Sequence, residues 1–481
     1  MSRLGALPPK VDLLVIGGGI TGAGIFREAV RAGVSVLLVE ARDYASGTSS
    51  WSSKLVHGGL RYLNTGEWRL TAESVRERER LLREAPDLVQ SLDFVMPLYH
   101  GIKPGKTTMR LGLWLYDRFS SGGARSRFLP AAEASAVQPG LRAQNLLGAM
   151  RYQDARTDDC RLVLRLIDQG QREGGLALNY LVAERLLQAR GRVCGAALRD
   201  AETGESREIE AGLVINAAGV WADALPGQPA GAPRLRPLRG SHLVFPQARL
   251  PLPQAVGWLH PRDQRPVFAY PWQGATLLGT TDLDHREELW NPRMQRAEAD
   301  YLLEALDWLL PGAALGLADA LSSYAGVRPV VDDGADQPSA ASRESAQWQS
   351  PGFIGVTGGK LTTFRVTARQ ALRAAARQLP ALRLAADSAP LFDRALRESP
   401  AELPDLAQIG ARAGEQVFHL DDLLLRRSRA GLVVPEGAEA LIEPALAACR
   451  AQLGWDSERC AAEAGRYREY WRRQHDPRAL G

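Results

Sequence analysis

Hydrophobic and polar positions form a repeating pattern in the first forty residues. An apolar run at residues 11–16 is followed by an amphipathic stretch at 20–32, and a second apolar run covers 34–39. Short apolar runs next to glycine are typical of buried strands, and apolar positions three or four residues apart are typical of helices. The pattern therefore predicts a strand, a helix and a second strand, the unit from which parallel sheets are built.

The same periodicity predicts more helices further along the chain, together with one basic amphipathic piece between residues 93 and 150. The predicted helices cover residues 69–85, 157–173, 298–310 and 361–379. Beyond about residue 380 the chain becomes rich in Ala, Leu, Arg and Glu, and strand signals almost vanish. This tail is predicted to be a separate small helical domain.

Strand signals are concentrated in the middle of the chain. Alternating runs joined by turn-forming residues predict a small antiparallel meander, and a β-rich stretch covers 234–284. The runs of the meander are residues 177–183, 193–200 and 206–210. An apolar run at 213–219 ends in small residues, which suits a place where the backbone passes close to a ligand.

A glycine motif, Gly17-x-Gly19-x-x-Gly22, lies between the first predicted strand and the first predicted helix. Glycines here permit a tight turn and bring the backbone close to a pyrophosphate at the helix N-terminus. Glu40 ends the second strand, where an acceptor for a ribose hydroxyl is needed, and its charge disfavours a 2′-phosphate. The pattern predicts a Rossmann-like domain that binds FAD or NAD rather than NADP.

Composition is ordinary for a folded protein, with 45% hydrophobic and 24% charged residues in 481. The formal net charge is +4, and Lys and Arg do not gather with aromatic residues, so nucleic acid is not an expected partner. The four cysteines are scattered, which favours a reducing compartment and no metal site. No run of about 18 apolar residues is present, so membrane contact is expected to be peripheral.

Five separated blocks of sequence resemble one family. They are 12–24 (DLLVIGGGITGAG), 52–62 (SSKLVHGGLRY), 240–246 (GSHLVFP), 279–282 (GTTD) and 358–363 (GGKLTT). In this order they resemble the FAD-dependent, respiratory glycerol-3-phosphate dehydrogenases, within the D-amino-acid-oxidase-like flavoprotein fold. The resemblance covers residues 10–375 well and the tail more loosely.

The resemblance implies an activity and a place in the cell. It implies that sn-glycerol 3-phosphate is oxidised to dihydroxyacetone phosphate by hydride transfer to flavin N5, with electrons passed to a membrane quinone. It also implies a cytoplasmic protein held peripherally at the inner face of the cell membrane, and it is compatible with a homodimer. Oxygen remains open as an alternative acceptor, since a flavin can pass electrons to either.

The family also implies a fold class and a division into domains. The class is α/β (α+β), with a Rossmann-like FAD-binding domain, an interleaved β-rich substrate domain and a C-terminal helical domain. The FAD-binding domain is expected to comprise residues 1–92, 151–233 and 321–379. The substrate domain is expected at 93–150 and 234–320, and the helical domain at 380–481.

Oxidation of a phosphorylated alcohol requires a group that fixes the alcohol, a proton acceptor and cations that hold the phosphate. By resemblance the catalytic residues are His242, Arg328 and Lys360, and the substrate-binding residues are Arg61, Tyr62, Thr280 and Arg343. His57 is the alternative proton acceptor. Four cations from distant parts of the chain are therefore expected to meet in one pocket.

The expected cofactor-binding residues come from the glycine motif, the polar loop after Glu40 and the later glycine-rich turns. They are Gly17, Gly19, Gly22, Glu40, Thr48, Ser49, Ser53, Lys54, His57, Gly58, Gly219, Gly359, Lys360, Leu361 and Thr362. Asp158 and Asp159 follow Thr157 at a predicted helix start, so we interpret them as capping residues and not as metal ligands.

Two rival functions and one membrane question remain open from the sequence. An amine or hydroxyacid oxidase of the same fold would need a carboxylate site with fewer cations, and a non-catalytic paralogue would bind flavin without turnover. Leu111, Trp114, Leu115 and Phe119 have helical spacing and basic neighbours. This segment either lies in the headgroup layer of a membrane or packs on its own domain.

Overall fold

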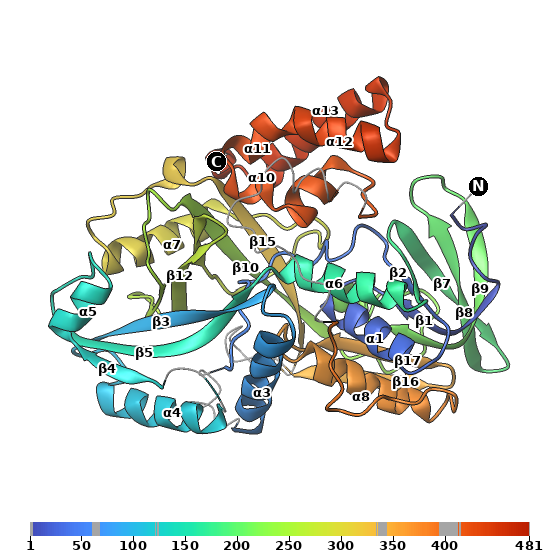
Figure 1. Cartoon of the computed structure of the whole chain (residues 1–481), viewed down its shortest axis with the longest axis horizontal. Coiled ribbons are helices and arrows are strands. Elements are labelled where there is room, and N and C mark those ends of the chain that lie inside the picture. Colours follow the sequence, from blue (N-terminus) through green and yellow to red (C-terminus); the bar gives the residue numbers. More distant parts are fainter. Residues whose placement is uncertain are drawn as a thin grey trace.

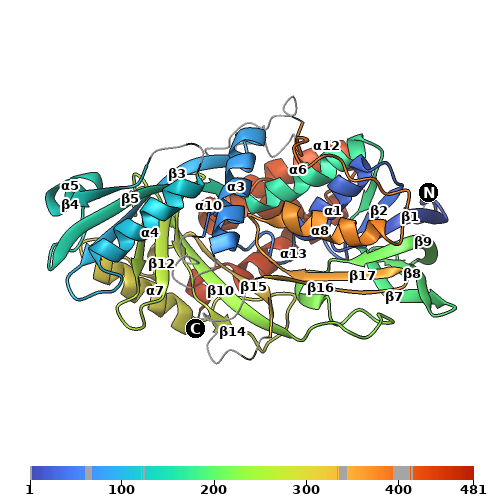
Figure 2. The same cartoon turned by 90° about the horizontal axis from the view of Figure 1, so that it is seen from below.

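Two β-sheets lie along the long axis of the molecule, and the C-terminal helices pack beside them (Figure 1). The structure is a computed structural model that describes residues 3–59, 68–120, 122, 125–332, 334, 344–393, 412 and 415–480. Figure 2 shows the same arrangement from below. The mixed α/β class predicted from the sequence is confirmed. After the last strand, the described C-terminal part of the chain is helical.

The first sheet contains the strands of the predicted nucleotide-binding unit. Its central order is β16 (Ser345–Ser350), β17 (Phe353–Gly358), β9 (Ser206–Asn216), β1 (Lys10–Ile16), β2 (Val36–Val39) and β6 (Leu176–Leu178). β1 pairs in parallel with both β2 and β9. The apolar run of β1 is buried because a parallel strand in the middle of a sheet is covered on both faces.

Three helices cover one face of this sheet. They are α1 (Ile20–Arg31), α6 (Asp159–Arg172) and α8 (Phe364–Ala376), and α1 contacts both of the others. The predicted antiparallel meander is present as β7 (Leu181–Ala189), β8 (Arg192–Asp200) and β9. The run predicted at 177–183 is two strands, because the backbone turns at Tyr180, whose φ is +55°. The runs at 206–210 and 213–219 form one strand, β9, up to Asn216.

The second sheet is mostly antiparallel and has the order β14-β10-β13-β12-β11-β3-β5-β4, with β15 paired to β10. Its strands are β3 (Val89–Tyr99), β4 (Arg127–Pro130), β5 (Leu146–Thr157), β10 (Leu235–Pro246), β11 (Ala255–Leu259), β12 (Pro266–Trp272), β13 (Ala275–Gly279), β14 (Leu283–Asp284) and β15 (Ser322–Val331). Its helices are α3 (Trp68–Glu84), α4 (Lys106–Phe119), α5 (Ala131–Val137) and α7 (Arg296–Leu309).

Sheet membership differs from the predicted domain boundaries at two places. β15 lies within 321–379, which was expected in the FAD-binding domain, yet it pairs along its whole length with β10 of the second sheet. β5 also crosses the boundary at residue 151 and pairs with β3. The sequence carried no sign of these pairings because strand partners far apart in the chain leave no local pattern. The division into domains itself stays a prediction.

The described part of the tail consists of short and medium helices. They are the π-helical turn η4 (Asp422–Arg427), α10 (Ala430–Val433), α11 (Pro435–Ala438), α12 (Ile442–Leu453), α13 (Ser457–Gln474) and the 3-10 turns η5 (Glu439–Leu441) and η6 (Pro477–Ala479). Their apolar side chains share one core with the second sheet, where Leu423 and Trp471 belong to the same buried cluster as Phe94 and Tyr324. The tail is helical as predicted, but it packs on the sheet instead of having a core of its own.

Candidate active site

The turn between β1 and α1 passes tightly beneath the end of β9. Gly17 has a φ of +110°, and a Cβ added there would lie 2.5 Å from the carbonyl oxygen of Ala217. A Cβ on Gly22 would lie 1.8 Å from the carbonyl oxygen of Gly17, so the third glycine allows the helix to pack on the strand. Side chains at these two positions would open the turn.

The N-terminus of α1 faces a cavity that has a volume of about 350 Å³. Gly19 precedes the helix and provides no side-chain cap, while the Ser49 hydroxyl accepts a hydrogen bond of 2.9 Å from the backbone N–H of Ile20. A helix end with free N–H groups attracts anions such as a pyrophosphate. We call this space the nucleotide cavity. Its lining includes Gly17, Gly19, Glu40, Ser46, Thr48, Ser49, Ala217, Gly219, Trp221, Trp290, Gly359 and Leu361.

Glu40 lines the nucleotide cavity at the end of β2, as predicted. Its carboxylate accepts hydrogen bonds from the backbone N–H groups of Gly18 at 2.6 Å and Arg42 at 3.0 Å. Burial raises the pKa of Glu40, while these backbone hydrogen bonds work in the opposite direction. The glycine turn therefore helps to fix the orientation of the Glu40 carboxylate, for which the sequence predicts a hydrogen bond to a ribose hydroxyl.

A larger cavity of about 420 Å³ adjoins the nucleotide cavity and is called the substrate cavity below. Six residues line both spaces: Thr48, Ser52, Pro329, Gly359, Lys360 and Leu361. A ligand that extends from the nucleotide cavity would therefore reach the wall of the substrate cavity. The predicted residues Ser53, His57, Thr280, Arg328 and Thr362 also line the substrate cavity.

Arg328 projects into the substrate cavity from β15. One guanidinium nitrogen donates to the Asp282 carboxylate at 3.0 Å, and another donates to the Thr280 hydroxyl at 3.2 Å. A Cβ on Gly240 of the neighbouring strand would lie 2.2 Å from the guanidinium, so the glycine makes room for it. Lys360 is the second predicted cation on this wall. It lies just before α8, which begins at Phe364, whereas the sequence predicted a helix start at residue 361.

His242 lies behind the cavity wall and does not line either space. Its side chain is buried, its Nε2 lies 2.9 Å from the Ser53 hydroxyl, and its ring stacks on Tyr324. Burial, helped by the positive charges of Arg328 and Lys54, holds the pKa of His242 well below 6.5. The imidazole is therefore neutral, and Ser53 connects it to the substrate cavity.

His57 differs from His242 because it does line the substrate cavity. Its backbone carbonyl accepts a hydrogen bond of 3.2 Å from the Thr362 hydroxyl. This contact links the loop after β2 to the segment before α8, both of which were predicted to contact the cofactor.

Three of the expected cofactor residues are placed away from both cavities. Lys54 is fully buried, and its ammonium donates to the Asp159 carboxylate at 2.9 Å and the Ser50 carbonyl at 2.7 Å. The N–H of Gly58 donates to Asp154 at 2.9 Å, and Gly22 packs on the turn. These three residues therefore do not line either cavity, because Lys54 and Gly58 form hydrogen bonds inside the protein and Gly22 packs on the turn. Their contact with the cofactor stays a prediction. Arg61, Tyr62 and Arg343 lie outside the described residues.

Asp158 is the N-cap of α6, as predicted, and its carboxylate accepts from the backbone N–H of Arg161 at 3.1 Å. Asp159 instead pairs with Lys54 and Arg429. Within the described ranges no group of three or more His, Cys, Asp or Glu side chains is arranged to hold a metal ion.

Several residues of the substrate cavity were missed from the sequence. Arg265 lines it and donates to the carbonyl of Asp282 at 2.9 Å. Aromatic and apolar side chains make up much of the remaining wall. They include Phe94, Met96, Leu98, Trp258, Phe268 and Trp308. For the residues on β3 and β12, the only sequence signal was the alternation of apolar residues, and alternation does not distinguish a cavity wall from a core.

The profile of the family described as "FAD dependent oxidoreductase" matches residues 12–372. The chain belongs to this family. It is 37% identical over 360 residues to an aerobic glycerol-3-phosphate dehydrogenase of Bacillus subtilis (strain 168), covering 74% of this chain and 64% of that one. It is 35% identical over 376 residues to the enzyme of that name from Staphylococcus haemolyticus (strain JCSC1435), covering 77% and 68%. The chain thus spans about two thirds of the length of these relatives.

A solved structure is similar over almost the whole chain. It is the glycerol-3-phosphate dehydrogenase from Bacillus halodurans complexed with FAD, with a TM-score of 0.78, 27% identity and coverage of 97% of this chain and 94% of that one. These findings confirm the resemblance seen in the motifs and FAD as the cofactor. The glycine turn, the exposed helix N-terminus and Glu40 fit the phosphates and a ribose of FAD.

Proposed function

We propose that the chain is an FAD-dependent dehydrogenase of sn-glycerol 3-phosphate. The observation that carries the proposal is that Arg328 and Lys360 line one cavity, and that this cavity shares a wall with the nucleotide cavity. Two cations suit a doubly charged phosphate, and the planar guanidinium can donate to two of its oxygens. The predicted Arg61 and Arg343 would add to this charge.

When bound, FAD supplies the acceptor for the hydride of the carbinol carbon. The chain must hold the phosphate, orient the alcohol and accept its proton. We assign the phosphate to Arg328 and Lys360, with Thr280 fixing one edge of the guanidinium. Holding the phosphate at one end keeps the carbinol carbon near the shared wall and reduces the entropy lost on reaching the reacting geometry.

We assign proton acceptance to His242 acting through Ser53. The neutral imidazole is already in its basic form, and the Ser53 hydroxyl lies between it and the cavity. A proton from the substrate hydroxyl would pass to Ser53 while the Ser53 proton passes to Nε2. The low pKa of His242 means that the proton is then released readily. His57, which lines the cavity, is assigned to the cofactor side of the site.

We propose a quinone as the electron acceptor. The substrate cavity has more apolar wall than a small phosphorylated alcohol needs, and Phe94, Trp258 and Phe268 would suit a flat apolar ring. The reduced holoenzyme is expected to be reoxidised faster by a short-chain quinone than by dissolved oxygen. Faster reoxidation by oxygen would make the protein an oxidase and contradict this part of the proposal.

We also propose that α4 contacts a membrane surface. Met109, Leu113 and Tyr116 are buried against the domain, whereas Leu111 and Trp114 are 59% and 51% exposed. One face of α4 therefore packs on its own domain, and the exposed face is the one that we propose lies in the headgroup layer. Basic side chains flank the exposed face, as in helices that lie at anionic headgroups. Among the described residues no helix is long and apolar enough to cross a membrane.

Anaerobic mixing of the yellow holoenzyme with glycerol 3-phosphate tests the proposed reaction. The visible flavin absorbance is expected to bleach, and glycerol, glycine and lactate at the same concentration are expected to leave it unchanged. Bleaching by an amino acid or a hydroxyacid would favour the oxidase alternative. Unchanged absorbance with all four compounds would favour a non-catalytic flavoprotein.

A further inference from the structure

The loop from Asp43 to Lys54 forms part of the wall of both cavities. Ser46, Thr48 and Ser49 line the nucleotide cavity, and Ser52 and Ser53 line the substrate cavity. No helix or strand lies within this loop. Its shape must therefore be fixed by hydrogen bonds to other segments, since the backbone has no ladder of its own. Thr48 and Ser49 make such contacts in the middle of the loop, and the buried charges bind at its two ends.

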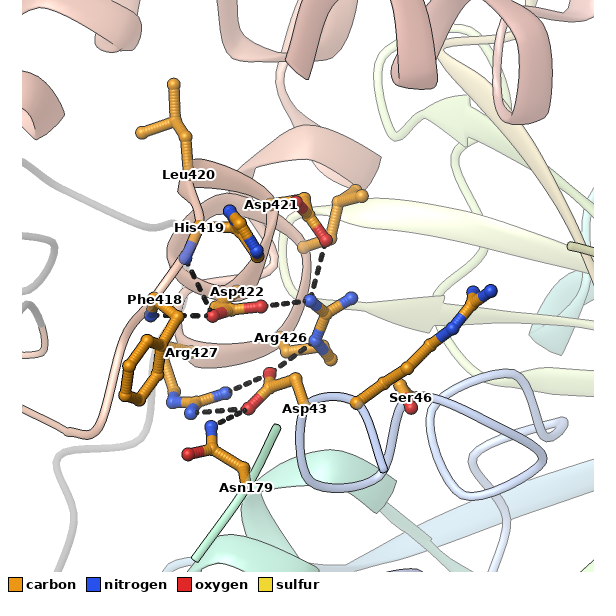
Figure 3. A network of polar contacts seen from close by, with 12 residues as sticks. Asp43, Ser46, Asn179, Phe418, His419, Leu420, Asp421, Asp422, Arg426 and Arg427 are labelled. Carbon is orange, nitrogen blue, oxygen red and sulfur yellow. Dashed lines mark hydrogen bonds and ion pairs between the residues drawn. The ribbon is translucent and has the colours of Figure 1, made fainter. Parts of the chain in front are cut away.

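The first end of the loop is held by two arginines of η4. Asp43 is fully buried, and Arg427 donates to both of its carboxylate oxygens, at 2.5 and 2.8 Å (Figure 3). Arg426 donates its Nε–H to the same carboxylate at 2.5 Å, and Asn179 adds a bond of 2.9 Å. Although burial opposes ionisation, Arg427 and Arg426 hold the pKa of Asp43 below its ordinary value.

The second end of the loop is held through one intermediate residue. Arg429 is fully buried and donates to Asp158 at 2.9 Å and to Asp159 at 2.5 Å. Asp159 in turn accepts from the backbone N–H of Ser52 at 3.1 Å, the Ser52 hydroxyl at 2.7 Å and the Lys54 ammonium at 2.9 Å. Arg429 therefore fixes the carboxylate that binds the last residues of the loop.

The three arginines belong to a short segment with unusual backbone geometry. Residues 422–427 form a π-helical turn, and Arg429 has a φ of +62°, which non-glycine residues rarely adopt. Such conformations persist only where surrounding contacts determine them, and π-helical turns occur often at functional sites. Here the geometry directs Arg426 and Arg427 to Asp43 at the first end of the loop, and Arg429 to Asp159, which binds the second end.

We propose that Arg426, Arg427 and Arg429 are positioning residues of the flavin site: they hold the loop 43–54 against the cofactor from the C-terminal helices. The tail thus contributes to flavin binding although none of these arginines lines either cavity. Buried ion pairs add little net stability compared with apolar packing, but their fixed hydrogen-bond geometry suits them to set a conformation. The inference depends on FAD binding and not on the identity of the substrate.

The test compares two charge-balanced double variants of the full chain. D43N/R427Q removes one charge of each sign from the loop contact. E28Q/R369Q does the same at an equally buried pair between α1 and α8, joined at 2.9 Å, which does not touch the loop. For each protein the dissociation constant of FAD is measured by quenching of flavin fluorescence on apoprotein, together with visible circular dichroism and the thermal midpoint of the apoprotein.

D43N/R427Q is expected to raise the dissociation constant of FAD at least about tenfold and to change the visible circular dichroism of the bound flavin. E28Q/R369Q is expected to change the dissociation constant of FAD less than about twofold. The two double variants are expected to lower the thermal midpoint of the apoprotein by similar amounts. Equal effects of the two double variants on FAD binding would overturn the proposal, as would D43N/R427Q binding FAD like the unchanged protein.

R429K provides a second test if D43N/R427Q does not fold. Lysine keeps the charge but lacks the planar fork that reaches both Asp158 and Asp159. It is expected to weaken FAD binding in the same direction, and an unchanged dissociation constant with an unchanged spectrum would overturn the proposal. Because no readout uses glycerol 3-phosphate, failure here is distinguishable from failure to bleach the flavin, which concerns the proposed reaction.

Discussion

The Nε2 atom of His242 lies 2.9 Å from the hydroxyl oxygen of Ser53, and only Ser53 of the two residues lines the substrate cavity. The stack with Tyr324 and the close approach to Gly279 hold the imidazole in place, since a Cβ on Gly279 would lie 2.1 Å from the His242 ring. A buried neutral imidazole is thereby connected to the cavity by one hydroxyl. The following expectations for proton transfer depend on this contact.

His242→Asn is expected to slow anaerobic flavin reduction by glycerol 3-phosphate by about 10²–10⁴-fold, since a general base is lost. Ser53→Ala should slow it less, by roughly ten- to a hundredfold, because a water can replace the hydroxyl. His57→Asn changes a residue of the cavity wall and is the control; it should slow flavin reduction by at most about tenfold. Stopped-flow absorbance measures all three, and a larger loss in His57→Asn than in His242→Asn would reverse the assignment.

The pH dependence of flavin reduction is a separate expectation. Burial holds the pKa of His242 well below 6.5, so the imidazole is neutral throughout the range in which an exposed histidine titrates. The reduction rate should therefore show no inflection near pH 6.5. An inflection there that disappears in His242→Asn would contradict the neutral, buried imidazole.

Arg328→Met is expected to lower kcat/KM for glycerol 3-phosphate by about a hundredfold, because charge-assisted hydrogen bonds to phosphate contribute about 1.5–3 kcal/mol each. The kcat/KM of Arg328→Lys should lie between those of the unchanged protein and Arg328→Met, since lysine keeps the charge but lacks the planar guanidinium. The matched control is Arg236→Met, which breaks an Arg–Asp pair between β10 and β14 away from the cavity. Equal losses in the Arg328 and Arg236 variants would argue against a phosphate contact.

Membrane contact is tested by changing the exposed face of α4. Leu111→Ser/Trp114→Ser is expected to abolish flotation of the protein with anionic liposomes at low salt, because it removes the apolar side chains that would enter the headgroup layer. Leu283→Ser changes an exposed leucine on β14, at the other end of the second sheet, and should leave flotation unchanged. Unchanged protein that stays at the bottom of the gradient would contradict the proposed membrane surface.

Stability is expected to fall between neutral and alkaline pH because of His419. Burial alone would lower its pKa, but hydrogen bonds with Glu202 and Glu463 raise it from 6.5 to about 9. A raised pKa in the folded state stabilises fully below pH 6.5, and this contribution is lost as the pH rises through 9, an effect of about 1–3 kcal/mol. The thermal midpoint of unfolding should therefore fall less steeply across this pH range in His419→Gln than in the unchanged protein. Parallel curves for the two proteins would exclude this role of His419.

Local sequence patterns predicted the first strand, helix and second strand of the first sheet closely. The glycine motif, the strands around it and Glu40 lie together in the chain, so their geometry follows from adjacent residues. Lys54 shows the limit of this reasoning. Its position in a polar loop suggested the flavin, but Asp159, more than a hundred residues away, takes the ammonium. Partners of buried charges depend on tertiary packing, which a single sequence does not encode in any short pattern.

The same limit explains what was missed in the tail. Residues 380–481 were recognised as helical, but nothing in the sequence indicated that Arg426 and Arg427 bind Asp43 or that Arg429 binds Asp159. Arg265 and the aromatic wall of the substrate cavity were also missed, since strand alternation has the same form for a core and a cavity. By contrast, the family resemblance assigned Arg328 to the pocket, and Arg328 does line the substrate cavity.

The position of a phosphate tests the central claim most directly. A crystal structure of the holoenzyme with dihydroxyacetone phosphate is expected to show the phosphate oxygens within hydrogen-bond distance of the Arg328 guanidinium and the Lys360 ammonium, with the carbonyl carbon beside the flavin. A phosphate bound elsewhere, with Arg328 still turned only to Asp282 and Thr280, would contradict the account.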